Sequence, residues 1–202
     1  MGANLYPAMN AFSRVACALF LSLFTVSACA AVPEVAVNST MRAYQWHDGA
    51  QLRTVWLNPA LWMEFNASEG SKASVLNAVP AASVMSEQGD VRYWKVPESD
   101  LIPRTTAVLS EVFHVAPDPS APALSLPGNV LITLQSGWDL KTVNAWFAAH
   151  RLKPVKQLDM SGNVWVIQSP PGLASLTLAN QLAETAGVVN ASPNWWRPAA
   201  LK

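Results

Sequence analysis

The order of hydrophobic patterns in residues 129–202 constrains the fold of this chain most. Val130, Ile132 and Leu134 alternate as in a β-strand, and apolar residues then recur at helical spacing towards His150. Two further strands, a helix and a last strand follow. The expected elements cover Val130–Leu134, Leu140–His150, Val155–Asp159, Asn163–Gln168, Leu173–Ala186 and Val188–Ser192. This βαββαβ order predicts an α+β fold with a ferredoxin-like antiparallel sandwich, in which two helices cover one face of four strands.

Two residues mark the expected helix ends in this segment. The carboxylate of Asp139 can accept from exposed N–H groups of the first turn, and Gly187 stands where a left-handed C-terminal cap is wanted.

The second face of this sheet has no cover within residues 129–202. Successive strand residues face opposite sides, so either Val164 and Val166 or Trp165 and Ile167 must point to this face. Exposed apolar area of this kind usually marks a contact surface. The open alternative is that the preceding part of the chain covers the face. The contact candidates are Leu131, Thr133, Trp165 and Ile167.

Residues 34–115 predict a smaller, mostly-β module. Asp48-Gly49 lies between two alternating runs, which is a strong hairpin signal because glycine accepts the positive φ of the turn. A short helix is expected at Ser71–Ala78. The expected strands are Met41–Trp46, Gln51–Leu57, Leu61–Phe65, Val91–Val96 and Ala107–Val115. Four prolines in residues 116–128 predict an extended, semi-rigid linker between the two modules.

Residues 1–28 read as a signal peptide. Arg14 supplies a positive start, and the apolar run Val15–Val26 is shorter than the roughly 20 residues of a membrane-spanning helix. Val26-Ser27-Ala28-Cys29 resembles the lipobox of bacterial lipoproteins, which predicts lipidation of Cys29. Ordinary cleavage after Ala30 and a start at Met9 remain alternatives. The chain is therefore expected to be exported, as a membrane-anchored periplasmic lipoprotein or a secreted protein.

Composition narrows the possible partners. The chain has 13 basic and 13 acidic residues, so no basic field points to nucleic acid. Both cysteines, Cys17 and Cys29, lie near the leader, so no disulfide is expected in the exported chain. Charged residues make up only 13% of the chain while nine residues are tryptophan, which favours an apolar surface that meets a partner.

No pattern in the sequence points to catalysis or to a cofactor. The three histidines, His47, His114 and His150, are accompanied by no Gly-x-Ser-x-Gly motif and no metal-ligand spacing. A glycine-rich phosphate loop is also missing. We therefore expect a binding protein, with neither enzymatic activity nor a small-molecule cofactor.

Three stretches carry a resemblance to a known family. They are Asn129–Asp139, with its Gly137-Trp138-Asp139 helix start, Phe147–Leu152 at the end of the first helix, and Gly187–Asn194 with its Pro193-Asn194 ending. Together they resemble the propeptide domain of subtilisin-like serine proteases, and residues 34–115 are more weakly similar to the β-rich extension of fervidolysin-like propeptides. Two positions depart from the family: Arg151 stands in place of a usual glycine, and Ser192 in place of an acidic residue.

The resemblance implies a function for the sheet face and for the end of the chain. The open face would pack on a subtilisin-like protease, and a tail would enter its substrate cleft as an added strand. The chain would thus act in trans as a folding chaperone, an inhibitor, or both. The alternative for the two tryptophans is that they close the sheet edge as core residues. The expected tail is Trp195, Trp196, Arg197, Pro198, Ala199, Ala200, Leu201 and Lys202.

Two other functions remain open at this stage. One is an envelope lipoprotein whose ferredoxin-like module binds a partner unrelated to proteases. The other is the remnant of a truncated protease precursor.

Overall fold

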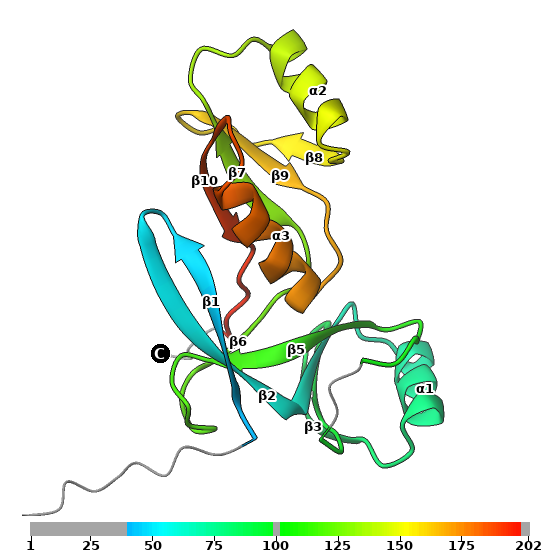
Figure 1. Cartoon of the computed structure of the whole chain (residues 1–202). Coiled ribbons are helices and arrows are strands. Elements are labelled where there is room, and N and C mark those ends of the chain that lie inside the picture. The colour runs from blue at the N-terminus through cyan, green and yellow to red at the C-terminus, as the bar shows by residue number, and fades with distance from the viewer. Residues whose placement is uncertain (1–39, 99–101, 199–202) are drawn as a thin grey trace, which may run out of the picture. The chain divides into compact units, whose positions relative to one another are not determined.

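The computed structural model describes residues 40–98 and 102–198, which belong to one compact unit, Ala36–Lys202. The predicted signal peptide, Cys29 and Ala199–Lys202 lie outside the described residues. The described part of the chain is a mixed α/β structure with two antiparallel sheets and three helices (Figure 1). Among the described helices, none has the length and apolar character needed to cross a membrane.

The first sheet has the strand order β3-β4-β2-β5-β6, and β1 pairs with β2. The predicted hairpin is confirmed: Asp48 pairs with Gln51 across a turn in which Gly49 has a φ of 61°. Its strands are β1 (Arg42–Asp48), β2 (Gln51–Phe65), β3 (Ser83–Gln88), β4 (Val91–Lys95), β5 (Val108–His114) and β6 (Ala123–Ser125), and α1 (Glu69–Ala78) follows β2.

The structure corrects three expectations in this region. The two strands predicted before and after Asn58-Pro59-Ala60 form one continuous strand, β2, with a register shift between Asn58 and Trp62. The predicted linker contains β6, because Leu124 and Leu126 are apolar and fully buried between the prolines. The strand β3 was not expected, since its side chains are mostly polar and exposed.

The two faces of the first sheet are covered differently. On one face, Trp62, Trp94 and Leu109 pack with Val75 of α1. On the other face, the apolar cluster around Met63, Phe65 and Val112 is covered in part by Trp196 from the end of the chain. Trp196 thus takes part in the core of the first sheet.

Glu64 and Arg92 form an ion pair inside the first sheet, with side chains that are 0% and 3% exposed. Arg92 Nη1 lies 3.0 Å from Glu64 Oε2, and the same oxygen accepts from Trp94 Nε1 at 2.8 Å. The hydroxyl of Ser71 donates to the other carboxylate oxygen. Burial by itself lowers the pKa of Arg92, but its hydrogen bond to Glu87 and the charge of Glu64 raise the pKa above its usual value. Both carboxylate oxygens of Glu64 therefore accept hydrogen bonds, and the ion pair is part of a buried polar network.

The second sheet follows the predicted βαββαβ order, with strands arranged β10-β7-β9-β8 and all pairs antiparallel. Asp139 caps the first helix by accepting from the backbone N–H of Thr142 at 2.7 Å. Arg151 after that helix has a φ of 56°, in the left-handed region that favours glycine. The elements are β7 (Val130–Leu134), α2 (Leu140–Ala149), β8 (Pro154–Gln157), β9 (Asn163–Ile167), α3 (Leu173–Ala183) and β10 (Val188–Pro193).

Candidate docking surface

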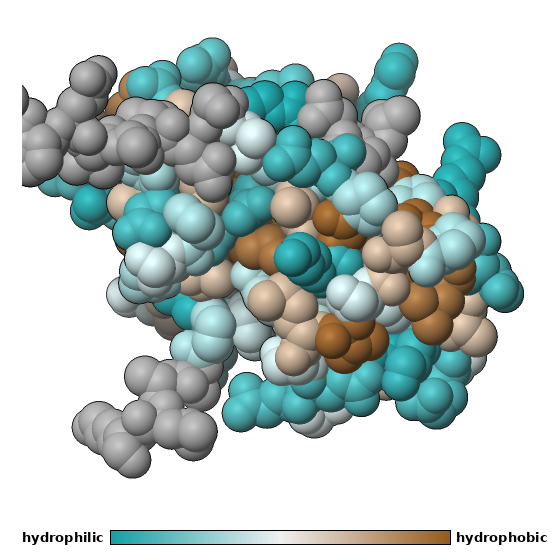
Figure 2. All heavy atoms as spheres, turned by 90° about the horizontal axis from the view of Figure 1, so that it is seen from below, coloured by the Kyte–Doolittle hydropathy of each residue, from teal (hydrophilic) through white to brown (hydrophobic). Residues whose placement is uncertain are grey.

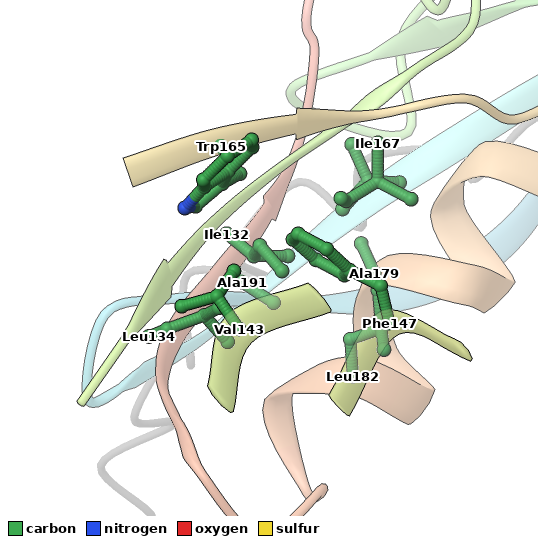
Figure 3. Close-up of a cluster of buried hydrophobic side chains, with 10 residues drawn as sticks. Ile132, Leu134, Val143, Phe147, Trp165, Ile167, Ala179, Leu182 and Ala191 are labelled. Carbon is green, nitrogen blue, oxygen red and sulfur yellow. The ribbon is translucent and has the colours of Figure 1, made fainter. Parts of the chain in front are cut away.

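Strand register decides which residues of the second sheet face the helices. Ile132 pairs with Trp165, and Val130 pairs with Ile167, so each pair lies on the same face of the sheet. These side chains form the core with residues of both α2 and α3 (Figure 3). Trp165 is 8% exposed and Ile167 is fully buried. The prediction that Trp165 and Ile167 lie on the open face is therefore wrong, because their partners on β7 point to the helices.

The open face is built from the alternate residues. Leu131 pairs with Val166, and Thr133 pairs with Val164, so the predicted candidates Leu131 and Thr133 do lie on the face opposite the helices. Lys156 of β8 continues the row of Leu131 and Val166.

A hollow of about 500 Å³ lies on this open face. None of its lining residues belongs to a described helix or to the strands β1–β6, so the described residues before Asn129 do not line it. Sequence reasoning missed Val155 and Leu158: the register shift between Pro154 and Lys156 decides where Val155 lies, and Leu158 follows the end of β8. The lining residues are Asn129, Leu131, Val155, Lys156, Leu158, Val166 and Asn194.

The hollow combines an apolar floor with a polar rim. The Asn194 backbone N–H donates to the carbonyl of Asn129 at 3.4 Å, and the Asn194 amide donates to the carbonyl of Gly128 at 3.4 Å. Lys156 brings one positive charge to the lining, which includes no acidic residue and no histidine. Such a surface can exclude water from an apolar partner, and Lys156 is the one charged side chain it offers.

The surface elsewhere shows isolated apolar side chains. Leu52, Met85 and Val115 are 54%, 55% and 45% exposed, and they come from different strands or loops. On the face drawn in Figure 2, apolar residues are interspersed with hydrophilic ones. Scattered exposure of this kind is normal for folded proteins.

The C-terminal segment, which we define as Trp195–Pro198, attaches to the first sheet. Trp196 and Ser125 exchange two backbone hydrogen bonds of 2.8 and 3.1 Å. The ring of Trp195 packs edge-on against Trp46 and Phe113, with centroid distances of 5.5 Å to each.

The two tryptophans point into different clusters, because successive residues of an extended segment face opposite sides. Trp195 joins the cluster of Trp46 and Phe113, whereas Trp196 packs against Phe65 at 5.8 Å. The prediction of a free tail is therefore wrong for Trp195 and Trp196, which close the edge of the first sheet. Arg197 and Pro198 are exposed.

A carboxylate joins the first sheet to α3. Glu111 Oε2 accepts from the backbone N–H of Leu173 at 3.1 Å, at a helix start where Gly172 has no side chain to act as a cap. A Cβ on Gly172 would lie only 1.8 Å from this oxygen, so glycine is needed for the approach. Burial raises the pKa of Glu111, although the hydrogen bond from Leu173 opposes the shift.

The histidines are not gathered into a reactive group. His114 is buried, and its Nδ1 lies 2.8 Å from the carbonyl of Ala121, while His150 Nδ1 lies 2.9 Å from the carbonyl of Trp146. In residues 40–98 and 102–198 there is no group of three or more His, Cys, Asp or Glu residues that could hold a metal ion.

Comparisons with family models, curated proteins and solved structures found no match to this chain.

Proposed function

We propose that this chain is a binding protein whose open sheet face docks on a subtilisin-like serine protease, as an inhibitor, a folding chaperone, or both. The hollow on the open face of the second sheet carries this proposal. It joins an apolar floor to an asparagine rim, and no other described element covers it.

The strand order supports assigning the second sheet to the ferredoxin-like class. When the four strands of the βαββαβ unit are numbered along the chain, their order across the sheet is fourth, first, third, second. Both helices contribute to one core with this sheet. This is the layout expected of a ferredoxin-like sandwich. Of the propeptide-like residues, Pro193 ends the edge strand β10, and Asn194 follows it directly and lines the hollow.

The part of the tail proposed for the substrate cleft now begins at Arg197. Trp195 and Trp196 are engaged with the first sheet, so residues 197–202 remain for an extended interaction with a protease. Main-chain hydrogen bonds would supply affinity in such a complex, and alternate side chains would supply specificity. Pro198 cannot donate a backbone hydrogen bond, so pairing in the cleft would rest on the residues around it.

Inhibition kinetics test the docking surface. We expect the purified protein to inhibit its cognate subtilisin-like protease, and Leu131→Lys to raise the inhibition constant at least about tenfold, because the change buries a charge in the centre of the contact. Leu140→Lys is the matched control: Leu140 is 61% exposed on α2, away from the open face, and its replacement should leave the constant unchanged.

Deletion of residues 197–202 tests the tail separately. Weaker inhibition after the deletion supports insertion into the cleft, whereas unchanged inhibition would limit the contact to the sheet face. A protein that neither inhibits nor assists the refolding of any subtilisin-like protease would refute the proposal. The alternative would then be an envelope lipoprotein whose open face binds a partner unrelated to proteases.

A further inference from the structure

The C-terminal segment is held by one reciprocal pair of backbone hydrogen bonds and by ring contacts of its two tryptophans. Ser125, the last residue of β6, pairs with Trp196 in an isolated bridge, and both tryptophans stay partly exposed. Continuing this antiparallel register would bring Pro198 opposite Ala123. Proline has no backbone N–H, so that pair could make at most one of its two hydrogen bonds.

One polar atom in the segment also lacks a partner. Trp195 Nε1 is buried and has no hydrogen bond, although its ring contacts Trp46 and Phe113. A buried donor without an acceptor weakens the attachment of the segment to the first sheet, because the same atom would bond to water after the segment is released. By contrast, Leu126 beside the bridge is held independently, since its backbone N–H donates to Ser110 Oγ at 3.2 Å.

We propose that the C-terminal segment opens as a unit, without unfolding of either sheet, and that its release regulates the proposed binding of a protease. Segments with few buried contacts open locally at lower free energy than core strands. The regulation rests on the proposed function. While the segment is attached to the first sheet, the N–H and C=O of Trp196 bond to Ser125 and cannot pair with a strand of the protease. Only the released fraction of molecules offers the full extended segment after Pro193. Attachment of the segment to the first sheet therefore lowers the apparent affinity for the protease.

Amide hydrogen exchange tests the opening without any partner. The N–H groups of Ser125 and Trp196 bond to each other's carbonyl groups, so one opening event exposes both. We expect the two amides to show the same protection factor, at least about tenfold lower than the protection factors of Leu126 and of the β7 amides. Equal protection of all these amides would overturn the proposal, because the segment would then open only with the sheets.

A reversible lock tests the regulation. Opposite residues in an antiparallel pair have Cα atoms about 4.5–5.5 Å apart, within the range that a disulfide spans. Ala123 and Pro198 line the same cleft of about 270 Å³ on the first sheet. In a Cys29→Ser background, we expect the oxidised Ala123→Cys/Pro198→Cys protein to inhibit at least about tenfold more weakly than the same protein after reduction.

Two further variants complete the test. Ala123→Cys alone should respond to neither oxidant nor reductant. Trp46→Leu removes an edge contact of Trp195 and should speed both amide exchange and the onset of inhibition. Equal inhibition by the oxidised and reduced double variant would overturn the regulation and leave the proposed function standing. If neither form nor the parent inhibits any protease, the proposed function and the regulation fail together, while amide exchange still decides whether the segment opens.

Discussion

Replacing Arg92 with methionine should remove a large part of the folding stability. The change leaves the Glu64 carboxylate in a fully buried position without its counter-charge, although Trp94 and Ser71 still donate to it. Breaking a buried ion pair on one side typically costs about 3–5 kcal/mol. For a domain of this size, that loss lowers the melting temperature by about 6–20 °C.

An exposed ion pair in the same sheet provides the control. Arg53 and Asp48 lie 2.5 Å apart, but their side chains are 55% and 45% exposed. Solvent screening reduces such a pair to less than about 1 kcal/mol, so Arg53→Met should change the stability little. Urea unfolding followed by circular dichroism measures both variants, and an unchanged slope against urea shows that the unfolding reaction is the same.

A double variant separates the ion pair from the packing. Glu64→Gln removes the charge but keeps an acceptor for Trp94 Nε1. We expect Glu64→Gln combined with Arg92→Met to be about 1–3 kcal/mol more stable than Arg92→Met alone. The reasoning is refuted if Arg92→Met costs no more than Arg53→Met, because burial would then add nothing to the pair.

Three further variants test the ends of the helices. Burial raises the folded-state pKa of Glu111, so the stability that this group contributes is greatest below its unfolded pKa and is lost as pH rises through its folded pKa. Glu111→Gln should remove this contribution to the pH dependence of the melting temperature, and an unchanged pH profile would contradict the reasoning. Gly172→Ala should destabilise the fold more than Gly137→Ala, because both glycines have positive φ but only a Cβ at position 172 would meet Glu111. Urea unfolding measures the two losses in the free energy of unfolding, and equal losses would contradict this. The hydrogen bonds from Thr142 lower the pKa of Asp139, so the charged cap stabilises the fold above the unfolded pKa of this group and is lost as pH falls through its folded pKa. Asp139→Ala should therefore lower the melting temperature at neutral pH but not at strongly acidic pH. An equal loss at both pH values would argue against a charged cap.

Local patterns in the sequence determined much of the secondary structure. The alternation of Val130, Ile132 and Leu134 identified β7 and its buried face, and Asp139 identified the start of α2. The Asp48-Gly49 turn identified the β1–β2 hairpin. These signals were sufficient because a strand period, a helix cap and a turn each depend on residues close together in the chain.

Only the tertiary structure decided which residues form the candidate surface. Val164 to Ile167 are all apolar, so their pattern cannot tell which side faces the helices, and the register with β7 settles it. The docking of Trp195 depends on Trp46, and the start of α3 depends on Glu111. Contacts between residues so far apart in the chain leave no periodic signal, because they arise from the way the two sheets pack and not from any local preference of the backbone.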